Sequence, residues 1–139
     1  MRDFAAVLVD VRWPAGAAAV LDTARGAGIP AVLDGDIGPP DALLDLARRA
    51  THTVFSEPGL ALVSGTAAPG EGLLRMASRC PGRVGVTLGP GGYLWREGAR
   101  EERAPAPAIT AVDTLAAGDV WHGAFTLALG EGQGRCVGG

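Results

Sequence analysis

The sequence predicts an α/β protein whose sheet is parallel at first and antiparallel at one edge. Short apolar runs alternate with helical patterns through the first half of the chain, which is typical of strand–helix–strand units that form a parallel sheet. Two further runs are joined by Pro-Gly-Gly, which is typical of a hairpin. The length of 139 residues is enough for one domain with a hydrophobic core.

The first half contains three predicted strands, each short and apolar, and each followed by a helical pattern. Buried strands are expected at 5–11, 30–34 and 53–56. Helices are expected from Pro14 to about Gly28, at 40–50, at about 58–63 and at about 69–79. In the second of these helices Leu43, Leu44 and Ala47 are expected to face the core, and Leu73, Leu74 and Ala77 are the apolar residues of the last.

The second half contains the hairpin and one long helix. The hairpin strands are expected at 83–89 and 93–97, a third strand near 101–106, and a helix at 117–130 before a glycine-rich tail. Glu101 and Glu102 are expected to be solvated charges that protect an edge strand.

The composition excludes several classes of function. A net charge of −3 gives no electrostatic reason to expect nucleic acid or a membrane surface as a partner, and the apolar runs are too short to span a bilayer. The chain contains no lysine, which excludes a P-loop lysine and a Schiff-base lysine. The two cysteines make no metal or disulfide pattern, so we expect a cytoplasmic protein.

The stretch 112-VDTLAAGDVWHGAF-125 places small residues and an aspartate where an apolar helix begins. Backbone N–H groups at the start of a helix have no partner within the helix, and small side chains leave them open to an anion. Asp119 is therefore a candidate to act on a bound hydroxyl group. The same residue types also make an ordinary helix cap, because aspartate is a favoured N-cap residue.

The segment 113-DTLAAGDVWHGAF-125 resembles the C-terminal signature of the PfkB/ribokinase family of carbohydrate kinases. That signature reads Asp-Thr-x-small-small-Gly-Asp, then three free positions, small residues and an apolar one, and every constrained position is met. The resemblance implies a ribokinase-like sheet flanked by helices and ATP-dependent phosphoryl transfer to the hydroxyl group of a sugar. It also implies that Asp119 is the catalytic base and that Ala116, Ala117 and Gly118 form the anion hole.

Two other segments resemble the same family, and they imply ATP and Mg²⁺ as cofactors. The segment 84-VGVTLGPGGYLW-95 is similar to the family's Val-Thr-Leu-Gly-x-x-Gly hairpin, which implies that Thr87, Gly89 and Gly92 lie near ATP. The segment 30-PAVLDGD-36 is similar to the family's strand that ends in Asp-Pro-Asn near the phosphates and the metal. Asp34 matches this motif, and Asp36 stands where asparagine is usual.

The chain departs from the family in its magnesium motif, Asn-x-x-Glu. The segment 56-SEPGLALVSG-65 has Ser56 in place of the asparagine and Gly59 in place of the glutamate. Glu57 is a candidate to hold magnesium through water, and Asp34 and Asp36 are the alternative. Ketohexokinase-like branches of the family loosen the same motif, which suggests a ketose or a ketose derivative as the acceptor.

The resemblance covers nearly all of the chain but only about the second half of a typical family member. We therefore expect residues 1–139 to be the C-terminal, ATP-side part of a kinase domain, incomplete and with little activity alone. The half that grips the sugar is expected to be missing, together with the lid, and the full-length form is a candidate homo-oligomer.

Two other interpretations stay open at this point. One is a non-catalytic, truncated remnant that only binds nucleotide. The other is a phosphatase of the haloacid dehalogenase type, because 31-AVLDGDIG-38 is an apolar strand followed by Asp-x-Asp, with Asp34 as nucleophile and Asp36 as acid. That design also needs a lysine and a later acidic pair, neither of which is found.

Arg12 is a further candidate because it follows the first strand, and ligands of open α/β sheets bind beyond the carboxyl ends of the strands. It could contact an anionic or polyhydroxyl substrate. The simpler interpretation is a solvated arginine, and His52 is likewise expected at the surface.

Overall fold

The described part of the chain forms a six-stranded sheet in which every strand pairs with its neighbours in sequence, in the order β1-β2-β3-β4-β5-β6. The computed structural model describes residues 6–97 and 99–105. The strands are β1 (Val7–Val9), β2 (Ala31–Gly35), β3 (His52–Phe55), β4 (Arg83–Thr87), β5 (Tyr93–Glu97) and β6 (Arg100–Ala104). Strands β1 to β4 are parallel, and β4, β5 and β6 are antiparallel. The predicted α/β sheet with an antiparallel edge is thus confirmed.

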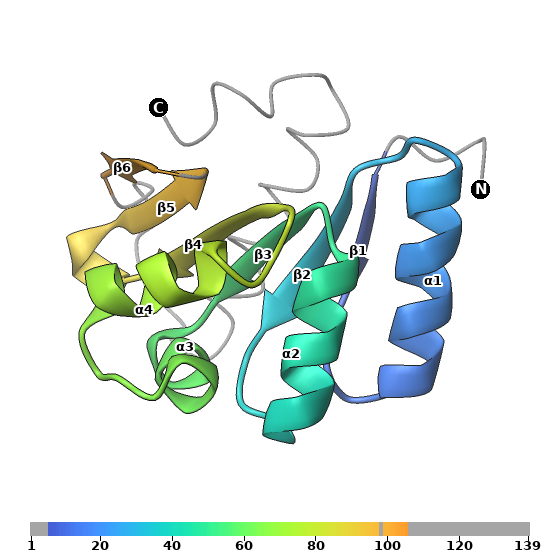
Figure 1. Cartoon of the computed structure of the whole chain (residues 1–139), viewed down its shortest axis with the longest axis horizontal. Coiled ribbons are helices and arrows are strands. Elements are labelled where there is room, and N and C mark those ends of the chain that lie inside the picture. The colour runs from blue at the N-terminus through green and yellow to red at the C-terminus, as the bar shows by residue number, and fades with distance from the viewer. Residues whose placement is uncertain (1–5, 98, 106–139) are drawn as a thin grey trace.

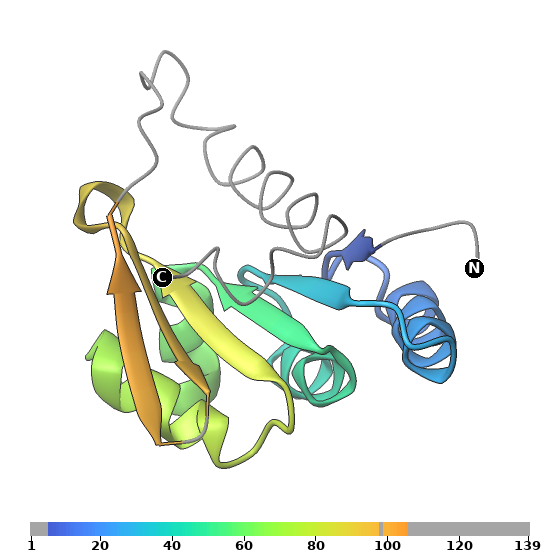
Figure 2. The ribbon, with the colours of Figure 1, turned by 90° about the horizontal axis from the view of Figure 1, so that it is seen from above.

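Four helices connect the parallel strands, and all four lie on one face of the sheet (Figures 1 and 2). They are α1 (Pro14–Gly26), α2 (Pro40–Arg49), α3 (Glu57–Ser64) and α4 (Pro69–Ala77), and a short 3₁₀ turn, η1 (Gly89–Gly91), joins β4 to β5. Because parallel strand crossovers are right-handed, a sheet that grows in one direction carries its helices on a single face.

The main core fills the space between these helices and the sheet. Leu21 and Leu43 come from the helices, Leu33 and Phe55 from the strands, and all four side chains are fully buried. A smaller cluster occupies the opposite face of the sheet, formed by Val32, Val54, Tyr93 and Trp95. The alternation of side chains along a strand explains why Val32 and Leu33 belong to different clusters.

The helices begin and end where the sequence carries start and stop signals. Each of the four has a proline in its first or second position, where the missing N–H group would have no partner within the helix. Helix α3 ends at Gly65, whose φ of 75° is the left-handed conformation that glycine adopts without strain.

Some burial expectations were wrong in detail. Leu44, expected to face the core, is only half-buried beside the buried Leu46. Leu8 is 41% exposed because β1 lies at the edge of the described sheet. These differences arise because the sequence gives the spacing of apolar residues but not which neighbour covers each of them.

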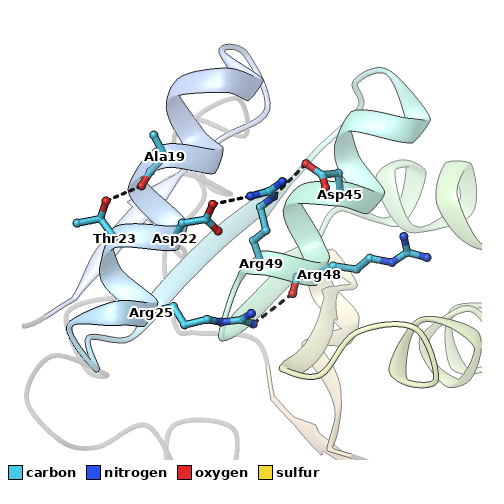
Figure 3. A network of polar contacts seen from close by, with 7 residues as sticks. All are labelled: Ala19, Asp22, Thr23, Arg25, Asp45, Arg48 and Arg49. Atoms are coloured by element: carbon cyan, nitrogen blue, oxygen red, sulfur yellow. Dashed lines mark hydrogen bonds and ion pairs between the residues drawn. The ribbon is translucent and has the colours of Figure 1, made fainter.

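One ion pair and one hydrogen bond join α1 and α2 on their exposed sides (Figure 3). Arg49 contacts Asp22 of α1 and Asp45 of its own helix, and the hydrogen bond and charge of Asp45 raise the pKa of Arg49. Arg25 of α1 donates a hydrogen bond of 3.3 Å to the carbonyl oxygen of Arg48. Exposed pairs of this kind contribute little to stability, so the buried core is the main support of this pair of helices.

Within the described ranges, no helix has both the length and the apolar character needed to cross a membrane.

Candidate functional site at the carboxyl edge of the sheet

The candidate residues that the structure describes all lie at one edge of the sheet. In parallel strands the carboxyl ends meet at the same edge, which is where ligands of open α/β sheets bind. Arg12 follows β1, Asp34 and Asp36 lie at the end of β2, Glu57 follows β3, and Thr87 ends β4. The turn that contains Gly89 and Gly92 leaves β4 at this edge too. We name this set of loops the carboxyl edge.

Asp34 is the last residue but one of β2, and Asp36 directly follows the strand. Asp34 is half-buried and pairs in register with Val54 of β3, so it points to the face away from the four helices. Asp36 is exposed just beyond the strand. Its Oδ1 atom accepts a hydrogen bond of 2.8 Å from the backbone N–H of Ile37 and one of 2.9 Å from the hydroxyl group of Ser56.

Ser56 connects the acidic end of β2 to the start of α3. Its Oγ atom donates to Asp36 and accepts a hydrogen bond of 3.0 Å from the N–H group of Gly59, so Ser56 is the N-cap of the helix. Glu57, in the first turn of α3, is exposed and makes no ion pair within the described part of the chain. In sequence, Ser56 is a departure from the magnesium motif, and nothing in the sequence predicts its contact with Asp36.

The turn between β4 and β5 depends on glycines at two of the predicted nucleotide positions. Gly89 has φ of 57° and Gly92 has φ of 90°, both in the region that side chains disfavour. The N–H group of Leu88 donates a hydrogen bond of 2.8 Å to the carbonyl oxygen of Gly92 and closes the turn. Gly89 is exposed, and a Cβ atom there would meet nothing within 4 Å. The backbone at Gly89 is therefore open to an approaching ligand, whereas Gly92 is buried.

Thr87 is half-buried at the end of β4 and lies in register with Tyr93. Its hydroxyl group makes one long hydrogen bond of 3.5 Å, to the carbonyl oxygen of Phe55. The ring of Tyr93 lies over Gly85, since a Cβ atom at Gly85 would stand 2.1 Å from the Tyr93 hydroxyl oxygen. Burial raises the pKa of Tyr93 well above its usual value, so its hydroxyl group stays protonated at physiological pH.

Arg12 lies at the same edge but reaches outward. Its side chain is 85% exposed, and its Nε atom lies 3.4 Å from a carboxylate oxygen of Asp10. The loop it belongs to contacts the loop after β2, because a Cβ atom on Gly38 would stand 3.0 Å from Val11. The loops that contain Arg12 and Asp36 therefore touch each other, and the charge of Arg12 is partly satisfied by Asp10.

The opposite, amino edge of the sheet carries a charged cluster that is remote from the candidate site. Arg83 lies over the ring of Trp95, 4.3 Å from its centre, and pairs with Glu97 at 2.8 Å. His52, expected at the surface, is instead half-buried beside Arg83. Burial is the main cause that lowers the pKa of His52 to about 4, and the charge of Arg83 adds to it.

The carboxylates at the end of β2 could hold a magnesium ion only together with water and the phosphates of a substrate. Among the described residues no three histidine, cysteine, aspartate or glutamate side chains gather as a complete metal cage would require. Magnesium usually keeps several waters and takes one or two carboxylates together with the phosphates of its substrate. Two neighbouring carboxylates, Asp34 and Asp36, match that lighter requirement. The predicted base, Asp119, and the predicted anion hole, Ala116, Ala117 and Gly118, lie outside the described residues.

Comparison with known proteins decides the family. The model of the pfkB family of carbohydrate kinases matches residues 1–135. The chain belongs to this family. A crystal structure from Agrobacterium tumefaciens, of a protein provisionally described as a ribokinase, is 46% identical with a TM-score of 0.87. The match covers 93% of this chain and 43% of that one.

More distant pfkB-family structures share the fold. A PfkB protein from Polaromonas sp. JS666 is 22% identical, with a TM-score of 0.74 over 93% of this chain and 47% of its own. Aminoimidazole riboside kinase from Salmonella enterica, solved with aminoimidazole riboside and an ATP analogue, is also 22% identical, with a TM-score of 0.74 over 91% of this chain and 48% of its own. The chain thus spans about half the length of these solved kinases.

Proposed function

We propose that this chain supplies the ATP side of a carbohydrate kinase, which transfers the γ-phosphoryl group of ATP to the hydroxyl group of a sugar. The observation that carries the proposal is the gathering of Asp34, Asp36, Thr87 and the Gly89–Gly92 turn at one edge of the sheet. The signature around Asp119 completes the set in sequence. Membership of the pfkB family supports phosphoryl transfer to a small molecule.

The order of these residues along the edge suggests how a nucleotide would lie. Neighbouring strands of a sheet are about 4.8 Å apart, so the ends of β2 and β4 are separated by about 10 Å, with the end of β3 between them. In this proposal the open turn at Gly89 and Gly92 borders the nucleotide. The phosphates extend across the end of β3 toward Asp34 and Asp36.

The chemistry assigned to the chain's own residues is positioning and charge stabilisation, on which phosphoryl transfer mostly depends. Asp119 accepts the proton of the sugar hydroxyl as its oxygen bonds to phosphorus. The backbone N–H groups of Ala116, Ala117 and Gly118 hold the oxygens of the transferred group. Asp34 and Asp36 would hold magnesium through water, and magnesium when bound neutralises and orients the phosphates.

The isolated 139-residue chain is expected to be a poor kinase. Loss of the residues that orient the acceptor removes positioning that lowers the barrier by about 7–11 kcal/mol in favourable cases. A non-catalytic remnant that only binds nucleotide is the second candidate. The family match gives no support to a haloacid-dehalogenase-type phosphatase using Asp34 and Asp36.

A transfer assay with labelled ATP and a panel of ketoses and other sugars tests the proposal. We would assay the 139-residue chain alone and the longest protein that contains it. Transfer to a sugar by the longer protein, with nucleotide binding but little transfer by the chain alone, is the expected result. Vigorous transfer by the chain alone would overturn the expected low activity, and absence of nucleotide binding in both forms would overturn the kinase assignment.

A further inference from the structure

The contact between Ser56 and Asp36 has a consequence for metal binding that builds on the proposed kinase function. We propose that Ser56 is a positioning residue, which holds the carboxylate of Asp36 in the orientation that receives magnesium at the nucleotide phosphates. The hydroxyl group of Ser56 donates to Oδ1 of Asp36 at 2.9 Å, and the N–H group of Ile37 donates to the same oxygen at 2.8 Å. The carboxylate is therefore fixed by two donors on one oxygen.

The other oxygen of Asp36 is left for a ligand. Within residues 6–97 and 99–105, Oδ2 of Asp36 takes part in no hydrogen bond or ion pair, and the residue is exposed at the carboxyl edge. A carboxylate held through one oxygen presents the other with little loss of side-chain freedom when a cation or its water binds. Hydrogen bonds to a ligating carboxylate commonly set its orientation in this way.

The position of Ser56 is itself fixed by the helix that follows it. Its Oγ atom accepts a hydrogen bond of 3.0 Å from Gly59, which orients the hydroxyl hydrogen toward Asp36. The first turn of α3 lies so close to β2 that a Cβ atom on Gly59 would stand 2.1 Å from the carbonyl oxygen of Gly35. A glutamate at position 59 has no room in this packing. In our proposal Asp36, at the end of the neighbouring strand β2, supplies a carboxylate for the metal instead.

Binding of a non-hydrolysable ATP analogue, measured by calorimetry with Mg²⁺ and again with EDTA, tests this role without relying on turnover. The dissociation constant in EDTA divided by that with Mg²⁺ is the ratio that reports how much the metal strengthens binding. We expect Ser56→Ala to reduce that ratio by about tenfold, the low end of the loss seen when a ligand's hydrogen-bond partner is removed. The dissociation constant in EDTA should stay unchanged.

A double-mutant cycle separates positioning of Asp36 from simple capping of α3. In an Asp36→Asn background, Ser56→Ala should change the ratio by less than about twofold, since residues that act through one another are not additive. Ser56→Thr keeps a hydroxyl group and should restore the ratio. Ser78→Ala is the matched control, because that hydroxyl group bonds the carbonyl oxygen of Arg75 at 2.7 Å, away from the carboxyl edge.

The outcomes distinguish this inference from the proposed function. If the parent protein binds the analogue more tightly with Mg²⁺ and Ser56→Ala leaves the ratio intact, the role of Ser56 is overturned and the kinase proposal stands. Equal losses for Ser56→Ala in both backgrounds would show that it acts only as a helix cap. If the parent protein binds no analogue in either condition, the kinase proposal fails and the role of Ser56 fails with it.

Discussion

Gly59 lies directly against the carbonyl oxygen of Gly35: a Cβ atom on Gly59 would stand only 2.1 Å from it. This close approach joins the first turn of α3 to the end of β2, although the two elements are separated in sequence by a helix and a strand. The obstacle to a side chain at position 59 is a backbone atom and not a flexible side chain. Room for it can be made only if α3 or β2 moves. Only glycine fits at position 59 in this arrangement.

We therefore predict that Gly59→Ala destabilises the protein. The added methyl group must displace α3 from β2, and overpacking of this kind costs roughly 1–3 kcal/mol of the free energy of unfolding. Denaturant titration measures the change.

Gly26→Ala is the control for that substitution. Gly26 is the last residue of α1, and a Cβ atom there meets nothing within 4 Å. The same chemical change should leave stability unchanged or raise it by up to about 0.5 kcal/mol, since alanine favours helix. Equal stability of the two variants would contradict the close contact with Gly35.

The open turn after β4 gives a prediction for nucleotide binding. Gly89 and Gly28 have φ of 57° and 70°, and a Cβ atom on either would meet nothing within 4 Å. Substitution by alanine should therefore cost each about 1–2 kcal/mol through backbone strain alone. Only Gly89→Ala should also weaken binding of an ATP analogue, measured by calorimetry below the melting temperature of both variants. Similar affinities in the two variants would remove the turn from the nucleotide site.

The proposed base gives a prediction for turnover. In the form of the protein that phosphorylates a sugar, Asp119→Asn should lower kcat by about 10²–10⁴-fold, the usual contribution of a general base. Asparagine caps a helix as well as aspartate does, so stability and ATP binding should be nearly intact. Steady-state kinetics measures kcat, and calorimetry measures the affinity for ATP. Unchanged turnover in this variant would identify Asp119 as a structural cap instead, because asparagine keeps the cap and removes the base.

The half-buried His52 gives a prediction for pH dependence. Its pKa is about 4 in the folded protein and about 6.5 in an unfolded chain, so between these values the unfolded state binds more protons. The free energy of unfolding should then fall as the pH falls from about 6.5 toward 4, by up to about 1.4 kcal/mol for each pH unit from this residue.

The comparison of parent protein and His52→Gln isolates that contribution from those of the carboxylates. Denaturant titrations at several pH values should show a shallower decline for the variant. Arg83 and Glu97 are the charged groups that act on His52, so both must be retained. Parallel curves, or an imidazole pKa near 6.5 by NMR, would contradict the burial of His52.

The sequence predicted the elements well because their signals are local. The alternation of short apolar runs and helical patterns located every described strand and helix to within a few residues. Burial was harder, as Leu8 and Leu44 show. Leu8 was expected in a buried strand, and its exposure follows from the edge position of β1, which no local pattern encodes.

The location of the candidate site could be predicted from the sequence, but the contacts between its residues could not. Asp34, Asp36 and Thr87 follow apolar strands in sequence, so their arrival at one edge follows from parallel pairing alone. The hydrogen bond from Ser56 to Asp36 could not be predicted in the same way. It depends on the register of β2 against β3 and on how closely α3 approaches, both of which are set by the packing of distant residues.

The strand order has a consequence for how the protein is made. Since each strand within residues 6–97 and 99–105 pairs only with those before and after it in sequence, no strand of this sheet must wait for a later one of the set to be inserted beside it. As the ribosome releases each new strand, it can pair with the strand made just before it, which lies at the edge of the sheet formed so far. Pairing between strands that follow one another in sequence closes shorter loops than pairing between distant strands would, and this lowers the entropy cost of loop closure. Assembly can therefore proceed during synthesis along the same direction as the chain itself.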